Sequence, residues 1–228
     1  MRMFKKQKNI SQLPTKVKLF PLPEVMLLPQ TQLPLNIFEK KYIAMVDAAL
    51  AGDRLIAMIQ PIEETSDEKL HKIGCVGRIT SFQEASKGQY HITLLGLCRF
   101  KLIEEIVDDA APDSIKDDGF RRAKIDYSDY SDDFAKPSDE RQKLIDRQLL
   151  IDSIKDMLHQ MDLDIDWNDL ANTPNEMLVN AISMTSPFQI AEKQALLEAQ
   201  TAADRAELLI VLAKMTLNDQ PRNFDLIQ

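Results

Sequence analysis

The sequence predicts an α+β fold, with a β-rich N-terminal domain that carries one helix and an α-helical bundle subdomain after it. Residues 17–105 hold short apolar, β-prone runs broken by proline and glycine, and only residues 42–50 among them have a helical period. Beyond residue 138 the apolar period is helical throughout. The predicted parts are a flexible basic tail (1–16), the β-rich domain (17–127), an acidic linker (128–138), the helical subdomain (139–217) and a C-terminal tail (218–228).

Residues 17–39 form the proline-bordered start of the β-rich domain. A proline lacks the N–H that a central strand must donate, so this stretch is predicted to run as short extended pieces along sheet edges. The prolines are Pro21, Pro23, Pro29 and Pro34. After residues 36–39 the period changes, and one helical face gathers Tyr42, Met45, Val46, Ala49 and Leu50. Gly52 then stands where a helix would be capped.

The remaining strands follow in order. Residues 54–60 predict a buried strand that Pro61 ends, and the charged residues 62–72 predict a loop. Residues 73–85 and 90–97 predict a hairpin around a turn at 86–89, with Gly74 and Gly77 marking a bulge or a close backbone approach. Residues 99–105 continue extended, residues 108–119 predict an acidic loop, and residues 120–127 predict one more strand.

Helix start signals punctuate the last third of the chain. Ser138 precedes two acidic residues and the apolar stripe Leu144, Ile151, Ile154 and Leu158, which predicts one helix. Residues 173–176 (TPNE) and 186–189 (SPFQ) each predict a capped start with proline at the first helical position, and 201–204 (TAAD) predicts a third. Such short, punctuated segments are typical of a small helical bundle.

Charge and composition exclude several classes of protein. The net charge is −8, but residues 1–18 carry six basic and no acidic side chains, which leaves 22 basic against 36 acidic side chains and a charge of −14 for the rest. An acidic body repels nucleic acid and anionic lipid. No segment is apolar enough to span a membrane, the N-terminus has no secretory apolar region, and two cysteines favour a reducing compartment. We therefore expect a cytoplasmic protein that binds no membrane.

Catalytic and metal-binding motifs are absent from the sequence. It holds no Gly-x-x-x-x-Gly-Lys loop, no Gly-x-Ser-x-Gly elbow, no His-Glu-x-x-His and no Cys-x-x-Cys. Cys75, His91 and Cys98 would make a metal site if neighbouring strands brought them together, but two buried thiols and a surface histidine explain them as well. Because the carboxylates lie in loops and on helix faces, they predict solvated surfaces. We expect no catalytic residue, no metal and no cofactor.

Several segments form an ordered signature: LFPLP at 19–23, LP at 28–29 and LPLNIFE at 33–39 with Tyr42. Further segments of the set are Gln60, VGRI at 76–79, GLCRF at 96–100, EKQALLEA at 192–199 and DRAELL at 204–209. Taken in this order, they resemble the N-terminal substrate-binding domain of the Lon ATP-dependent proteases. The resemblance covers roughly residues 17–215 and is strongest to free-standing bacterial proteins that consist of this domain alone.

The resemblance implies a small PUA-like pseudo-barrel with one helix, followed by a helical subdomain. It also implies that the protein lacks the family's ATPase and Ser/Lys peptidase modules, since no Pro-Lys-Asp-Gly-Pro-Ser-type nucleophile segment is present. The protein is therefore expected not to be an enzyme. A label of peptidase would follow the domain name alone.

The signature residues have two interpretations. In the first they are core: Phe20, Leu28, Ile37, Phe38 and Phe100 pack inside, Met45 and Met58 fill gaps, and Arg99 packs its stem and pairs its head with a nearby acid. In the second, some of a set of five stay exposed as an apolar patch that receives unfolded segments or a partner helix. That set is Met26, Leu28, Leu33, Phe38 and Tyr42.

The leading hypothesis is a non-catalytic recognition module that binds unfolded, misfolded or hydrophobic protein segments. It would act as an adaptor or holdase linked to proteolysis, with a protease or chaperone as a further partner. The alternative is an RNA-binding PUA-like protein. Only the basic tail and Arg121–Arg122 support this hypothesis. A third possibility, an enzyme that uses scattered carboxylates, is not suggested by any spacing in the sequence. The sequence leaves the oligomeric state open.

Overall fold

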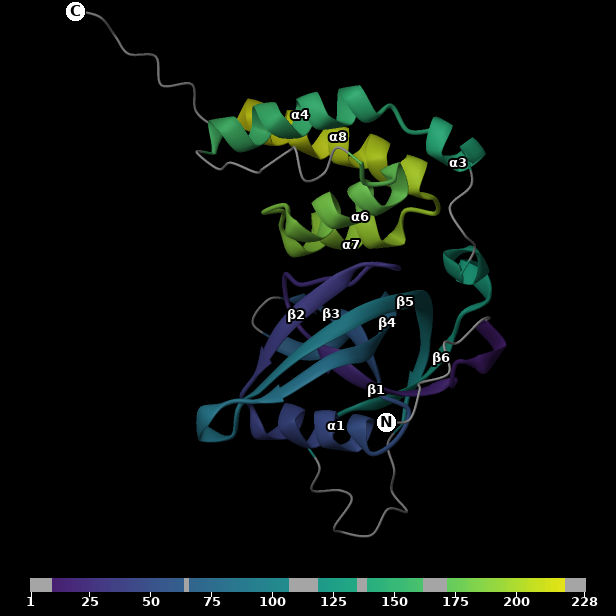
Figure 1. The fold of residues 1–228 in the computed structure, drawn as a ribbon, viewed down its shortest axis with the longest axis vertical. Helices are drawn as coiled ribbons and strands as arrows, with labels where there is room; N and C mark the ends of the chain where they lie inside the picture. The colour runs from purple at the N-terminus through teal and green to yellow at the C-terminus, as the bar shows by residue number, and fades with distance from the viewer. Residues whose placement is uncertain (1–9, 64–65, 107–118, 135–138, 162–171, 220–228) are drawn as a thin grey trace, which may run out of the picture. The chain divides into compact units, whose positions relative to one another are not determined.

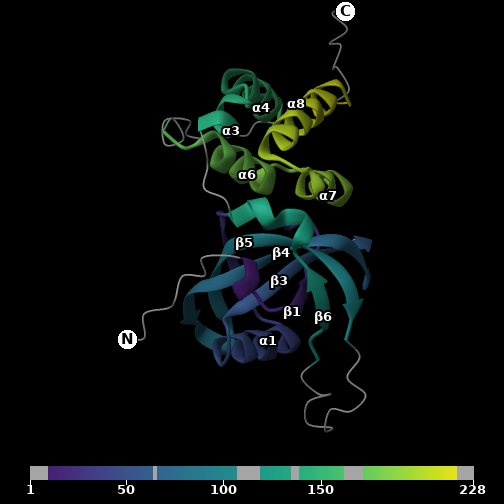
Figure 2. The same cartoon turned by 90° about the vertical axis from the view of Figure 1, so that its right-hand side faces the viewer.

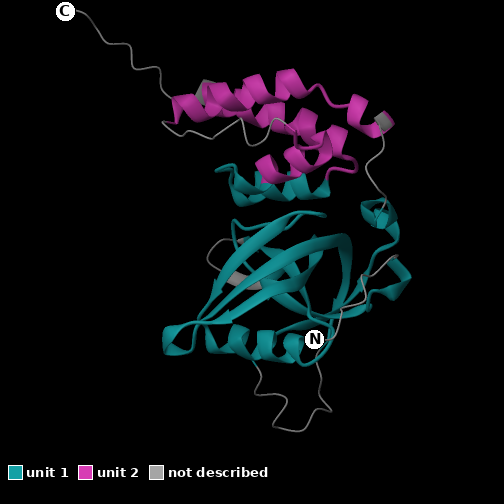
Figure 3. Ribbon diagram, viewed as in Figure 1, with its two compact units in different colours: residues 1–136, 184–198 teal, residues 137–183, 199–228 magenta. Residues whose placement is uncertain are grey.

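The computed structural model describes residues 10–63, 66–106, 119–134, 139–161 and 172–219. They divide into two compact units that are not contiguous in sequence (Figure 3). Unit 1 contains Met1–Lys136 and Met184–Glu198, and unit 2 contains Pro137–Ser183 and Ala199–Gln228. The sequence places residues 139–217 together in one helical subdomain, whereas the structure groups residues 184–198 with the β-rich part.

Unit 1 is built on one six-stranded sheet in the order β2-β5-β4-β3-β1-β6 (Figure 1). An additional pairing joins β5 to β6, so five of the strands close into a barrel and β2 extends the sheet beyond it. This is the α+β pseudo-barrel that the resemblance implied. The strands are β1 (Lys16–Pro21), β2 (Gln32–Ile37), β3 (Leu55–Glu63), β4 (Ser66–Glu84), β5 (Tyr90–Glu105) and β6 (Arg122–Asp126).

The long strand β5 serves both parts of this sheet. Its first half pairs antiparallel with β2, from Ile37 opposite Tyr90 to Gln32 opposite Leu95. Its second half pairs antiparallel with β6. Gly96 lies between the two halves, where a Cβ atom would collide with the carbonyl of Leu28. The chain needs glycine here because another segment of backbone runs directly over the strand.

Two predictions about the hairpin of β4 and β5 are settled by the structure. The expected close approaches are confirmed, because a Cβ on Gly74 would collide with the Met58 carbonyl and one on Gly77 with the Leu27 side chain. The expected loop at residues 62–72 is wrong: β3 continues to Glu63 and β4 begins at Ser66. Apart from residues 64 and 65, which lie outside the described residues, this segment belongs to the paired strands β3 and β4, and register shifts on both sides of Pro61 accommodate the proline.

Helix α1 (Lys40–Leu50) buries Tyr42, Met45, Val46 and Ala49 and contacts β1 and β3. This confirms the predicted apolar face, of which only Leu50 is half-buried. The short 3-10 helices of unit 1 are η1 (Ile10–Gln12), η2 (Ser86–Gly88) and η3 (Ser128–Phe134). η3 occupies the first part of the segment that the sequence interprets as an acidic linker. Residues 1–9 of the basic tail, and residues 135–138, lie outside the described residues.

The core of the barrel is continuous and apolar. It includes Leu19, Ala57, Val76, Cys98, Phe100 and Ile125, all buried. Met45 and Met58 are buried as well, which agrees with their predicted role as gap-fillers. Full burial of such side chains contributes about 1.5–3 kcal/mol each to stability.

Unit 2 contains α3 (Asp139–Lys143), α4 (Arg147–Gln160), α6 (Asn175–Thr185, its last two residues in unit 1) and α8 (Ala202–Asp219). The single helix predicted from Ser138 is wrong, because Asp146 accepts the backbone N–H of Leu149 at 3.0 Å and starts a new helix. Leu144, expected on the apolar stripe, is 72% exposed. α4 packs on α8 within this unit.

Helix α7 (Ile190–Glu198) belongs to unit 1 and contacts β3 and β4. In two perpendicular views α7 and α1 lie on opposite sides of the barrel (Figures 1 and 2). α7 starts three residues later than the Ser186–Pro187 signal predicts, since Glu192 accepts the backbone N–H of Gln189 at 2.8 Å. Among the described helices, none has the length and apolar character that crossing a bilayer requires.

Candidate functional site

The five residues predicted as an interaction patch do not share one environment. Met26, Leu28 and Tyr42 are buried, with 2%, 0% and 7% of their surface exposed. Leu33 is half-buried, and Phe38 is 65% exposed. The core interpretation therefore fits Leu28 and is wrong for Phe38, which projects from the sheet into solvent. Phe20, Ile37 and Phe100 are buried, as the core interpretation states.

Tyr42 is held inside by contacts with β1. Its hydroxyl donates to the carbonyl of Pro21 at 3.3 Å, and its ring centroid lies 4.4 Å from that of Phe20. The hydroxyl thus satisfies the hydrogen bond that a buried tyrosine needs. This contact fastens α1 to the end of β1 and fixes the position of the segment between β2 and α1.

One exposed and two half-buried apolar side chains lie on β2 or directly after it. Phe38 follows directly on β2, and Leu33 and Leu35 are half-buried on that strand. We call this set, Leu33, Leu35 and Phe38, the β2 corner. Ile37 between them is buried and anchors the end of the strand. About two-thirds of the surface of the large aromatic Phe38 side chain is exposed to water, so a partner that covers it makes the free energy of binding more favourable.

Phe82 adds a second exposed aromatic ring to the same end of the sheet. It is 41% exposed and lies edge-on to Tyr90, with ring centroids 4.9 Å apart. In the ladder, Phe82 and Leu35 both lie opposite Ile92, on strands that flank β5. Residues directly opposite one another share a face of the sheet, so Phe82, Ile92 and Leu35 form one cross-strand row.

The opposite face of these strands carries an open hollow of about 440 Å³. Two cross-strand rows of its lining are Pro34–Thr93–Ser81 and Asn36–His91–Gln83. None of the lining residues is Asp, Glu, Lys or Arg. The hollow offers hydrogen-bonding side chains next to the apolar Pro34, Leu35 and Ile92, which suits uncharged polar ligand groups. We call it the outer-face hollow.

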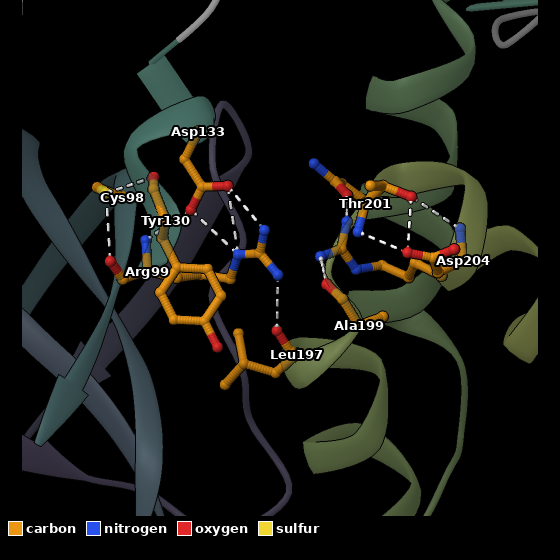
Figure 4. A network of polar contacts seen from close by, with 10 residues as sticks. Cys98, Arg99, Tyr130, Asp133, Leu197, Ala199, Thr201 and Asp204 are labelled. Carbon is orange, nitrogen blue, oxygen red and sulfur yellow. Dashed lines mark hydrogen bonds and ion pairs between the residues drawn. The ribbon is translucent and has the colours of Figure 1, made fainter. Parts of the chain in front are cut away.

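A network of buried polar groups joins α7 to the barrel of unit 1 (Figure 4). Arg99 and Asp133 are 2.8 Å apart at their closest atoms, with only 5% and 8% of their side chains exposed. Arg99 also donates to the carbonyl of Leu197 at 3.1 Å and lies over the ring of Tyr130, 4.4 Å from its centroid. The prediction that Arg99 pairs with an acid is confirmed.

Two more side chains of α7 form hydrogen bonds with polar groups of the barrel and of the segments next to it. Lys193 donates to the Glu24 carbonyl at 2.6 Å, and burial lowers the pKa of its ammonium group. Gln194 accepts from Gln60 at 3.0 Å and donates to the Ile73 carbonyl at 3.2 Å. These contacts use the polar groups of α7 to hold it in place, which makes the network a structural one.

The alternative metal site is not assembled. Cys75 and Cys98 are buried on adjacent strands, whereas His91 is exposed seven residues before Cys98 on β5, a distance of about 23 Å along a strand. Burial raises the pKa of both thiols, so they stay protonated at neutral pH. Across the described part of the chain, no group of three or more His, Cys, Asp or Glu residues is arranged to hold a metal ion.

The two arginines that motivated the RNA-binding alternative have local partners. Arg121 donates twice to the carboxylate of Glu105, both at 2.6 Å. Arg122 lies over the ring of Phe120, 4.2 Å from its centroid. Because both guanidinium groups are engaged by neighbouring side chains, they offer less to a phosphate than the sequence suggests.

Sequence reasoning did not identify the exposed Phe82, the half-buried Leu35 or the outer-face hollow. The strand alternation of LPLN and TSFQ carried part of the signal, since apolar and polar residues exchange faces there. The exposure of this face follows from the position of β2, which pairs with β5 beyond the edge of the barrel. This pairing joins strands that are distant in sequence, so no local pattern predicts it.

Comparisons with known proteins agree on one relationship. A sequence model of the family described as the ATP-dependent protease La (LON) substrate-binding domain matches residues 16–214. The chain is 25% identical over 216 residues to a Lon protease of Flavobacterium johnsoniae and 22% identical over 210 residues to one of Dictyoglomus thermophilum. These matches cover 87% and 86% of the chain but 24% of each relative, so the chain spans about a quarter of their length.

Solved structures show the same fold. The N-terminal domain of the Mycobacterium avium complex Lon protease superimposes with a TM-score of 0.62 at 16% identity, and the Lon N-terminal domain protein from Xanthomonas campestris with 0.57 at 18%. Each comparison covers 87% of this chain and 98% of the other. The likeness extends over both compact units.

Proposed function

The chain belongs to the LON substrate-binding domain family, and from that premise we propose that it recognises unfolded or hydrophobic segments of other proteins through the β2 corner. The observation that carries the proposal is the 65% exposure of Phe38, a bulky aromatic side chain in the middle of the family signature. Every other aromatic residue of that signature is buried. An exposed ring at this place is a candidate anchor for an apolar partner.

The role proposed is passive. The family match is to the substrate-binding domain, and the β2 corner itself consists of apolar side chains. The protein would hold its client as an adaptor or holdase, with a protease or chaperone as the acting partner. We propose the cytoplasm as its compartment, in keeping with its buried free thiols.

The direct test is fluorescence anisotropy with a labelled, permanently unfolded chain, such as reduced and carboxymethylated lactalbumin. Phe38→Ala should weaken binding about tenfold, which corresponds to about 1.4 kcal/mol of lost apolar burial. Ile103→Ala is the matched control, since Ile103 is 46% exposed on β5 and lies outside the β2 corner. The control should bind as the unaltered protein does.

Three outcomes would count against the proposal. The unaltered protein would bind no unfolded chain, or Phe38→Ala and Ile103→Ala would weaken binding equally, or Phe38→Ala would have no effect. The folded state of each variant is checked by near-ultraviolet circular dichroism, and because Phe38 is exposed we expect no change.

A further inference from the structure

We infer that the outer edge of β2 receives an extended client segment as an additional β-strand. The inference rests on the proposed function and specifies how the client is held. Its occupant is an uncharged polypeptide segment in which apolar and polar residues alternate. Main-chain hydrogen bonds would supply much of the affinity, and the two faces of the sheet beside β2 would select the side chains.

The ladder between β2 and β5 determines which backbone groups of β2 point outward. Thr31, just before the strand, accepts the N–H of Gly96 at 2.9 Å, so its carbonyl points toward β5. In an antiparallel pair the residues alternate between hydrogen-bonded and non-hydrogen-bonded positions. Leu33, Leu35 and Ile37 therefore bond to β5, while Gln32, Pro34 and Asn36 direct their backbone groups to the outer edge.

Pro34 gives an independent check of this assignment. A proline has no N–H to donate and is tolerated in a strand only where the ladder does not need one. Pro34 lies opposite Thr93 in an uninterrupted register of six residue pairs, so its missing donor must face outward. Both arguments place the same three residues at the edge.

This edge is available in the described structure. β2 ends the strand order of the sheet, and among the described strands β5 is the only one that pairs with it. The edge offers two N–H donors, at Gln32 and Asn36, and three carbonyl acceptors, at Gln32, Pro34 and Asn36. Six residues of strand correspond to about 20 Å, enough to pair with a segment of similar length.

The two faces beside the edge differ in chemistry, which predicts the client pattern. On one face the outer-face hollow presents Asn36, His91 and Gln83 with no charged lining residue. On the other face Leu33 and Leu35 are half-buried, and the exposed Phe82 lies in the same cross-strand row as Leu35. Side chains of an added strand would alternate between these surfaces, so alternation of apolar and neutral polar residues matches both.

The first test changes the edge without changing the ladder to β5. Asn36→Pro removes an outward N–H while Leu35, the residue before it, stays in the extended conformation that a proline requires. Asn36→Ala is the matched control, because it removes the same side chain and keeps the N–H. An eight-residue fluorescein-labelled peptide that alternates valine with threonine is the probe. Asn36→Pro should bind it about fivefold more weakly than Asn36→Ala, the value of one backbone hydrogen bond.

The reverse change should strengthen binding. Pro34→Ala restores an N–H at the only edge position that lacks one, and we expect about fivefold tighter binding of the same peptide. A groove that holds the peptide by side chains alone would show no gain.

A second measurement uses only the unaltered protein, so it does not depend on whether a variant folds. Two versions of the peptide are compared. In one, every threonine is N-methylated, and in the other, every valine is N-methylated. Only one alternating set of amides can face β2, so one version should lose binding and the other should keep it. Amide hydrogen exchange should meanwhile slow at Gln32 and Asn36 when the parent peptide binds.

The outcomes separate this inference from the proposed function. If Phe38→Ala abolishes binding but Asn36→Pro binds like Asn36→Ala and both methylated peptides bind, strand addition is refuted and the apolar docking role remains. If the unaltered protein binds no unfolded chain, both fail. Loss of binding in one methylated peptide alone, with slowed exchange at Gln32 and Asn36, supports strand addition.

Discussion

Arg99 and Asp133 form a buried ion pair in which Asp133 also accepts the backbone N–H of Arg99, at 2.8 Å. The pair ties β5 to η3, and the remaining donors of the guanidinium hold the end of α7 (Figure 4). Removing one partner of such a pair leaves the other charged and buried, which typically costs 3–5 kcal/mol.

We therefore predict that Arg99→Met lowers the free energy of unfolding of unit 1 by about 3–5 kcal/mol in urea titrations. Arg121→Met, which breaks the more exposed pair with Glu105, should cost less than about 1 kcal/mol. Equal losses in the two variants would show that the Arg99 network contributes no more than a surface contact.

The close approach of Leu28 to Gly96 makes that glycine irreplaceable. Gly96→Ala would push a methyl group into the Leu28 carbonyl, and we expect a loss of about 1–3 kcal/mol. Gly52→Ala is the control, because its Cβ would lie 3.5 Å from the nearest atom, an ordinary contact. Thermal unfolding followed by circular dichroism compares the two, and a neutral Gly96→Ala would mean that the Leu28 backbone can move away.

Phe38 and Phe100 should respond oppositely to truncation. Phe100 is fully buried in the barrel core, so Phe100→Ala should cost about 3–5 kcal/mol. Phe38→Ala should change stability by no more than about 0.5 kcal/mol because its ring is mostly in water. Chemical denaturation of both variants tests this, and a large loss in Phe38→Ala would assign that ring to the core.

The start of α8 is fixed by a capping box. The hydroxyl of Thr201 accepts the Asp204 N–H at 3.1 Å, while the Asp204 carboxylate accepts the Thr201 N–H at 3.0 Å (Figure 4). We expect Thr201→Ala to destabilise unit 2 by about 1 kcal/mol. Glu207→Ala, an exposed substitution later in the same helix, should be close to neutral, and hydrogen exchange in the first turn of α8 distinguishes them.

Alkaline pH should weaken the fold through its two thiols. Burial raises the pKa of Cys75 and of Cys98, so above the unfolded value of about 8.5 the unfolded chain loses protons that the folded chain keeps. Stability is then fully present below about pH 8.5 and falls as pH rises, by about 1.4 kcal/mol per unit for each thiol. Lys193 contributes with the opposite sign, because burial lowers its pKa.

Urea titrations at pH 8, 9 and 10 measure this slope. The double variant Cys75→Ala, Cys98→Ala should lose stability less steeply with pH than the unaltered protein. Parallel slopes in the two proteins would exclude the thiols as the cause.

The sequence predicted those features whose cause is local. Gly74 and Gly77 signalled a bulge or a close approach, Pro34 signalled an edge strand, and the threonine at 201 signalled a helix start. Each depends on one residue and its immediate neighbours. The exposed Phe38 and the buried Tyr42 could not be distinguished in this way, because both are aromatic residues of one apolar signature and differ only in what packs above them.

Long-range partners were beyond the reach of sequence patterns. Arg99 was expected to pair with an acid, but its partner Asp133 lies 34 residues away in a segment whose charge predicted a solvated linker. Lys193 and Gln194 resemble solvent-facing residues of a helix, yet both are buried against the barrel. Only the three-dimensional arrangement shows that the polar groups of α7 find partners on unit 1.

Because α7 belongs to unit 1 while the helices on both sides of it in sequence belong to unit 2, synthesis of the chain imposes an order on assembly. A ribosome releases residues 16–134, with all six strands, long before residues 190–198 emerge. About fifty further residues, most of them in unit 2, are synthesised before α7. During that time Arg99 and Gln60 of the nascent barrel lack their partners on α7. A gene fragment that stops at residue 136 would keep it in that incomplete state permanently.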